Sequence, residues 1–94
     1  MKKLYDISDF VNVLTEQKVL YGLVERVKER RKELKLTQQG LAKKSGVSYG
    51  SIRRFETTGE IALTSLLKIA NALNSLEEFN MLFSTELITN LKDY

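Results

Sequence analysis

Residues 46–56, which read GVSYGSIRRFE, decide how the chain folds. Gly46 suits the left-handed residue that ends a helix over about 38–44, and Ser48 suits the cap of a second helix over about 49–57. Because only residues 45–47 separate these two short helices, they must cross at a steep angle. The stretch therefore predicts a helix-turn-helix unit over residues 37–57, with Thr37 capping its first helix.

The same stretch predicts which side of the second helix faces outward. Ile52 and Phe55 share one face and should point into the core. The remaining side chains must then lie outward or on the flanks, where the start of such a helix can enter the major groove of DNA. Small residues allow a close approach to DNA, and arginine can pair with guanine or reach phosphate. This outward set comprises Ser48, Tyr49, Gly50, Ser51, Arg53 and Arg54.

Charge is distributed unevenly along the 94 residues, although the net charge is only +3. Residues 18–54 hold eleven Lys or Arg and three acids, a net +8, whereas the rest of the chain is net −5. A basic zone of this kind attracts phosphate-bearing partners. A solvated helix face explains the charge equally well, so charge alone does not decide between the two.

The composition of the whole chain predicts an all-α domain, because it has no proline and only five glycines. We expect a domain over 18–83, an N-terminal extension over 1–17 containing a short extra helix at about 8–15, and a C-terminal tail over 84–94. Ser75 and Glu78 form the pattern of a capping box that opens the last helix. The other expected helices are 18–34, 38–44, 49–57, one running from Leu63 to Leu73, and 76–83.

Residues 31–56, RKELKLTQQGLAKKSGVSYGSIRRFE, followed by SLLKIANALN at 65–74, resemble the Cro/phage-repressor (XRE) helix-turn-helix family. The resemblance covers about residues 28–73 and implies a compact five-helix, lambda-repressor-like DNA-binding domain. It implies that Gln38 contacts DNA phosphate and braces a base-reading side chain. Ser48, Tyr49 and Arg54 match base-facing positions, and Arg53 is expected to face phosphate. Gly50 stands at a base-facing position without a side chain, and mid-helix Gly40 departs from the family pattern.

Further roles follow from the resemblance. Arg31 and Glu56 match an arginine–glutamate ion pair that holds the helices together. The family's last helix often forms a dimer contact, which implies such a role for Phe79, Leu82 and Phe83. Lys43, Lys44 and Thr58 are candidates for phosphate contact, although a helix-end or loop role explains each of them as well. The implied partner is double-stranded DNA with a palindromic operator, bound by a homodimer that represses transcription.

Two rival interpretations stay open. Small XRE domains resemble HipB-type antitoxins, which bind a toxin protein and repress their own operon, with 1–16 or 85–94 as a partner-binding arm. Alternatively, the fold persists without DNA binding. An enzyme is not expected, because histidine and cysteine are absent and the carboxylates form no fixed pair. We also expect no cofactor, no metal and no membrane segment, and a cytoplasmic location.

Overall fold

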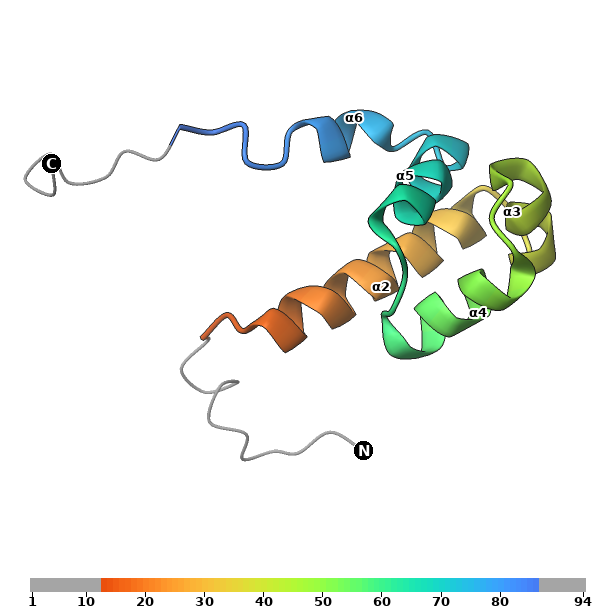
Figure 1. Cartoon of the computed structure of the whole chain (residues 1–94), viewed down its shortest axis with the longest axis horizontal. Helices are drawn as coiled ribbons and strands as arrows, with labels where there is room; N and C mark the ends of the chain where they lie inside the picture. Colours follow the sequence, from red (N-terminus) through yellow and green to blue (C-terminus); the bar gives the residue numbers. More distant parts are fainter. Residues whose placement is uncertain (1–12, 87–94) are drawn as a thin grey trace, which may run out of the picture.

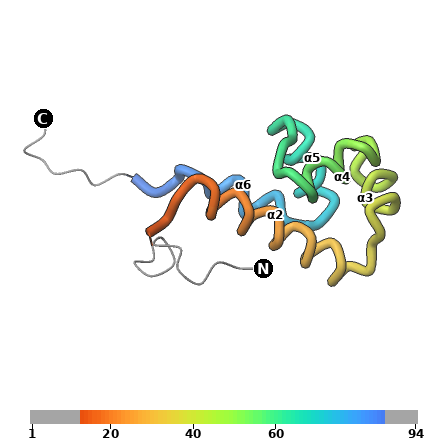
Figure 2. Tube along the Cα trace, turned by 90° about the horizontal axis from the view of Figure 1, so that it is seen from below, coloured from red at the N-terminus to blue at the C-terminus, as the bar shows by residue number. Residues whose placement is uncertain are grey.

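Five α-helices and no strand make up residues 13–86, the part of the chain that this computed structural model describes. The longest helix, α2, crosses the molecule, and the two short helices α3 and α4 lie at its C-terminal end (Figure 1). Helix α5 packs beside α3, and α6 follows it next to the C-terminal half of α2, where Arg30 contacts Ser75 and Glu78 (Figure 2). The helices are α2 (Glu16–Glu33), α3 (Gln38–Ser45), α4 (Tyr49–Thr58), α5 (Leu63–Ala72) and α6 (Leu76–Asn80).

Local capping signals place α3 and α4. The Thr37 hydroxyl accepts a hydrogen bond from the Gly40 N–H at 2.9 Å, and the Ser48 hydroxyl accepts one from the Ser51 N–H at 3.1 Å. Between them Gly46 adopts a left-handed conformation with φ of 80°, and its N–H donates to the Ala42 carbonyl at 2.9 Å. A side chain strains this conformation, which is why glycine suits the turn.

The core lies where α2, α3, α4 and α5 meet. The largest fully buried side chains are Leu41 of α3, Ile52 and Phe55 of α4, and Ile69 of α5. Val24 and Val27 cover this cluster from α2, and Val47 plugs it from the α3–α4 turn. Burying a large apolar side chain contributes about 1.5–3 kcal/mol. The burial of Ile52 and Phe55 therefore fixes which face of α4 remains outside.

The start of the described chain differs from the expected pattern. The extra helix expected at about 8–15 lies mostly outside the described residues, and residues 13–15 are not helical. Instead the Thr15 hydroxyl accepts from the Lys18 N–H at 3.1 Å, so α2 begins at Glu16 rather than at Lys18. Leu34, the last residue of the helix expected over 18–34, is an exposed C-cap residue after α2.

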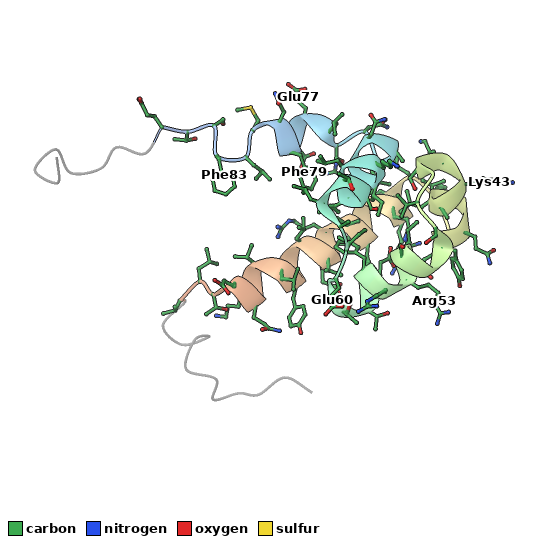
Figure 3. The ribbon with its side chains drawn as sticks, in the orientation of Figure 1. Lys43, Arg53, Glu60, Glu77, Phe79 and Phe83 are labelled. Carbon is green, nitrogen blue, oxygen red and sulfur yellow. The ribbon has the colours of Figure 1, made fainter. Side chains whose placement is uncertain are left out.

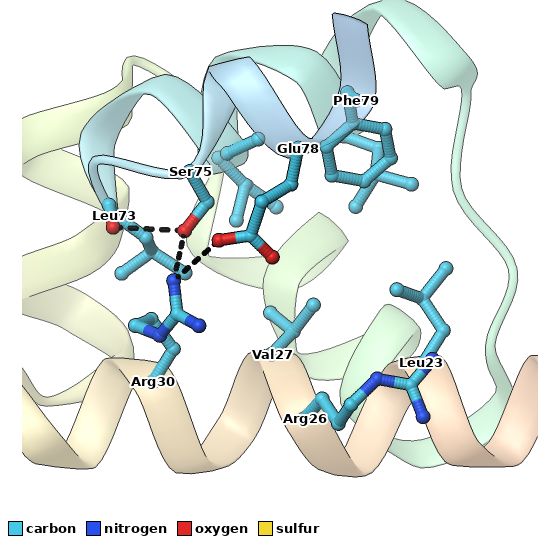
Figure 4. Close-up of a pocket in the computed structure, with 11 residues that line it drawn as sticks. Leu23, Arg26, Val27, Arg30, Leu73, Ser75, Glu78 and Phe79 are labelled. Carbon is cyan, nitrogen blue, oxygen red and sulfur yellow. Dashed lines mark hydrogen bonds and ion pairs between the residues drawn. The ribbon is translucent and has the colours of Figure 1, made fainter. Parts of the chain in front are cut away.

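The capping box predicted at Ser75 is wrong. The Ser75 hydroxyl accepts from Arg30 Nη1 at 2.6 Å and donates to the Leu73 carbonyl at 3.0 Å, so it makes no cap bond to α6. Arg30 Nη1 also donates to Glu78 Oε2 at 3.1 Å (Figure 4). A tertiary contact from α2 thus uses the two side chains that would form the box. Helix α6 correspondingly ends at Asn80 rather than at Phe83.

Candidate nucleic-acid interface

Helix α4 presents a polar outer face opposite its buried one. Ile52 and Phe55 are 0% and 1% exposed. All the remaining residues from 48 to 54 are exposed, including Tyr49 at 40%. A Cβ atom added at Gly50 would meet nothing within 4 Å, so the backbone there is open to an approaching molecule. The outer face of α4 therefore carries mostly small side chains at its N-terminal end and arginines one turn further on.

Arg53 and Tyr49 form one unit on this face. They stand four residues apart on α4, and the Arg53 guanidinium carbon lies 5.6 Å from the centre of the Tyr49 ring. Such a cation–π contact favours a fixed arrangement of both side chains. Figure 3 shows Arg53 projecting from the edge of the molecule, with Lys43 projecting from α3 nearby. The guanidinium is thus held over the ring with its N–H groups accessible.

Arg54 is held from the loop after α4. Its Nε donates to Glu60 Oε1 at 3.0 Å, and its Nη2 forms an ion pair with the same oxygen. Thr58 completes the arrangement, because its hydroxyl donates to the Arg54 carbonyl at 2.8 Å and accepts from the Glu60 N–H at 3.1 Å. Sequence reasoning gave Glu60 no role. The only local signal is an acid directly after Gly59, which does not match the i,i+3 or i,i+4 spacing of helix pairs.

Arg31, Glu56 and Gln38 form a buried network behind α4. Arg31 Nε donates to Glu56 Oε2 at 2.8 Å and Nη2 donates to Oε1 at 3.0 Å, a two-pronged pair. Arg31 Nη1 donates to the Leu36 carbonyl at 2.9 Å, and Gln38 Nε2 donates to Glu56 Oε1 at 2.8 Å. Arg31 and Glu56 are each 8% exposed. The network therefore links α2, α3 and α4 and fixes the angle of the outer face.

The N-terminus of α3 lies beside the same face. The Thr37 hydroxyl accepts from the Gly40 N–H, and the Thr37 carbonyl accepts from the Leu41 N–H. The N–H groups of Gln38 and Gln39 therefore have no partner inside α3. Such groups suit an anion. The Gln38 side chain is turned to Glu56, which takes one of the two N–H donors of its amide group. A shallow hollow between α3 and α4 is lined by Gln39, Gly40, Ala42, Lys43, Val47, Ser48 and Tyr49.

Little of the basic zone reaches this surface. Several cations of α2 are paired within the protein: Lys28 with Glu25 at 3.5 Å, Arg30 with Glu78, and Arg31 with Glu56. Helices α3 and α4 contribute four cations, Lys43, Lys44, Arg53 and Arg54. The two lysines are exposed and make no ion pair with any residue of 13–86. Lys43, Lys44 and Arg53 therefore offer positive charge on the outer faces of α3 and α4, whereas Arg54 is paired with Glu60.

The residues expected at a dimer contact are far from this surface. Phe79 is half-buried and packs against the core. Leu82 is 58% exposed and Phe83 fully exposed, at 101%. Figure 3 shows Phe79 and Phe83 on the opposite edge of the molecule from Arg53. The structure therefore separates an apolar exposed segment after α6 from the cationic face of α4.

Comparison with known proteins supports one assignment. A family model described as helix-turn-helix matches residues 27–79, more than half of the chain. No curated protein and no solved structure matches the sequence. Within residues 13–86, no helix is long and apolar enough to cross a membrane. The same residues contain no cluster of three or more acids suited to a metal ion.

Proposed function

The chain belongs to the XRE-type helix-turn-helix family of DNA-binding regulators, and on that premise we propose that it is a sequence-specific repressor of transcription that binds double-stranded DNA as a homodimer. The start of α4 enters the major groove, and α3 lies over the sugar–phosphate backbone. Occupying a promoter in this way excludes polymerase. The family is regulatory, and the proposed activity is binding alone, without a chemical step.

One observation supports this proposal above all: the outer face of α4 consists of small residues and arginines, while the inner face is packed into the core. Ser48, Gly50 and Ser51 let the backbone approach base edges. We infer that Arg54 pairs with guanine and that Arg53, which stacks on Tyr49, reaches phosphate, while Tyr49 contacts a thymine methyl group. The Arg31–Glu56 pair supports this face from behind without reaching DNA.

The homodimer is proposed through the segment after α6. Leu82 and Phe83 are exposed on the edge away from α4, and Met81 beside them is 60% exposed. A two-fold contact there leaves both cationic faces free for DNA. Two copies of α4 then read half-sites one helical turn apart, about 34 Å, on a palindromic operator. Phe79 contributes from its half-buried position at the base of the segment.

Salt dependence of DNA binding tests the proposal. Three phosphate-facing cations per subunit, Lys43, Lys44 and Arg53, give about six contacts in a dimer, so log K falls against log salt with a slope of about −5. Between 50 and 200 mM salt the affinity then drops by about 10³-fold. Gel-shift titration at several salt concentrations measures this slope. A protein that shows no retention on duplex DNA at low salt contradicts the proposal.

An antitoxin remains the second candidate, because the exposed segment Met81–Leu82–Phe83 also suits the surface of another protein. The two candidates differ in what covers this segment. Purified protein that sediments as a dimer at micromolar concentration supports the homodimer. A monomer that becomes stable only with the product of a neighbouring toxin-like gene supports the antitoxin.

A further inference from the structure

We propose that Glu60 is the residue that sets sequence discrimination by the α4 face, because it fixes the Arg54 guanidinium and cancels part of its charge. This inference rests on the proposed function, and it assigns a role to a residue outside the helix-turn-helix unit. Figure 3 shows Glu60 on the same edge of the molecule as Arg53. An acid on this edge is otherwise unfavourable for DNA binding, since it faces the phosphates of the duplex.

The contact geometry indicates bracing rather than chance proximity of charges. A single carboxylate oxygen, Glu60 Oε1, accepts from both Arg54 Nε, at 3.0 Å, and Arg54 Nη2. Of the five N–H donors of a guanidinium, three are left free, one on Nη2 and two on Nη1. The free donors lie along the outer edge of the guanidinium, the edge that can pair with the O6 and N7 atoms of guanine.

Glu60 is itself held in place by the turn that ends α4. Gly59 is left-handed, with φ of 85°, and a Cβ atom there would lie 2.8 Å from Leu20 Cδ2, so the turn is packed against α2. The Glu60 N–H donates to the Thr58 hydroxyl at 3.1 Å, and that hydroxyl donates to the Arg54 carbonyl. The side chain of Glu60 therefore contacts Arg54 directly, and its backbone N–H is linked to the Arg54 carbonyl through the Thr58 hydroxyl.

Two consequences follow for DNA binding. A fixed arginine loses less side-chain entropy when it pairs with its base than a free one does. The Glu60 charge also weakens attraction to phosphate at any sequence, because non-specific binding is mostly electrostatic. The first effect favours only the site that pairs with Arg54, whereas the second lowers affinity for every sequence, so Glu60 raises the ratio of specific to non-specific affinity through its hold on the Arg54 guanidinium.

The test compares Glu60→Ala, Glu60→Gln and a matched control, Glu77→Gln. Glutamine keeps an oxygen that can accept from Arg54 but removes the charge, and alanine removes both. The control removes the same charge from α6, on the opposite edge of the molecule (Figure 3). Each full-length variant is titrated against a site selected from random DNA by the wild-type protein and against a scrambled duplex, by fluorescence anisotropy at two salt concentrations.

We expect both Glu60 variants to bind scrambled DNA more tightly, with a salt slope steeper by about 1. The ratio of selected-site to scrambled affinity should fall by about tenfold in Glu60→Ala, and by less in Glu60→Gln. Glu77→Gln should leave the ratio within twofold. Equal discrimination by wild type and Glu60→Ala overturns the inference. So does a Glu60→Ala effect of undiminished size in an Arg54→Ala background, because Glu60 would then act independently of Arg54.

A measurement without DNA separates this inference from the proposed function. The Arg54 Nε–H resonance of the free protein should exchange with water more slowly in wild type than in Glu60→Ala. Equal exchange rates show that the pair does not form in solution and overturn the bracing role, whatever the protein binds. Absence of DNA binding by the wild type refutes the proposed function, and with it the role in discrimination.

Discussion

Replacing Glu56 by glutamine tests the buried network that positions α4. The substitution keeps the size of the side chain but leaves the Arg31 guanidinium, 8% exposed, without a counter-charge. A carboxamide has only one acceptor oxygen, so either the bond from Arg31 Nε at 2.8 Å or the bonds from Arg31 Nη2 at 3.0 Å and Gln38 Nε2 at 2.8 Å lose their acceptor, and the bonds that remain lose their ionic character. Removing one partner of a buried pair costs about 3–5 kcal/mol.

The expected loss is large for a domain of this size. Stabilities of small domains are about 5–15 kcal/mol. Each kcal/mol shifts the Tm by about 4–8 °C, so Glu56→Gln should lower the Tm by at least about 12 °C. Thermal and urea unfolding followed by circular dichroism measure the change. Glu25→Gln serves as the control, because its partner Lys28 lies 3.5 Å away on an exposed surface and such pairs contribute less than about 1 kcal/mol.

A double replacement separates burial of an unpaired charge from loss of packing. Arg31→Met combined with Glu56→Met removes both charges and keeps apolar volume, so it should recover most of the stability lost in Glu56→Gln. Recovery remains incomplete because the Leu36 carbonyl loses a hydrogen bond from Arg31. A Glu56→Gln protein that loses less than about 1 kcal/mol refutes this reasoning, as does a double variant no more stable than the single one.

Four further substitutions separate fold, DNA contact and assembly. Arg54→Ala should weaken operator binding by about 10- to 100-fold and relax sequence preference in gel shifts, with the Tm unchanged because its partner Glu60 is also exposed. Phe83→Glu should raise the dimer dissociation constant at least tenfold in analytical ultracentrifugation without lowering the Tm, since the side chain packs on nothing within its own subunit. Gly59→Ala should lower the free energy of unfolding by more than about 1 kcal/mol in urea titrations, because φ is 85° and the new Cβ meets Leu20 of α2. Gly50→Ala should leave stability intact, because its Cβ meets nothing, and should reduce DNA affinity.

Local signals were sufficient to predict the centre of the fold. Thr37 and Ser48 cap their helices and Gly46 takes the left-handed turn because each of these preferences depends on a few neighbouring residues. The inward positions Ile52 and Phe55 follow from the helical period alone. The all-helical class and the XRE-type assignment are likewise confirmed.

Features that depend on contacts between residues far apart in the chain could not be predicted from the sequence. Ser75 has the pattern of a cap, but Arg30, 45 residues earlier, takes its hydroxyl. Glu60 reaches Arg54 only because Gly59 reverses the chain, and an i,i+6 pair is not a helical spacing. The net charge of the basic zone likewise overstated the free positive charge, since Lys28, Arg30 and Arg31 of α2 form ion pairs within the protein.

Selection of bound sites from random double-stranded DNA tests the central claim most directly. The α4 face of a two-fold dimer should enrich a palindrome whose half-sites stand about 10 base pairs apart, with a guanine at one position of each half-site that Arg54→Ala no longer selects. If the protein binds the pool at the chosen salt concentration but enriches no sequence over the starting pool, the assignment of α4 as a reader of DNA sequence is contradicted.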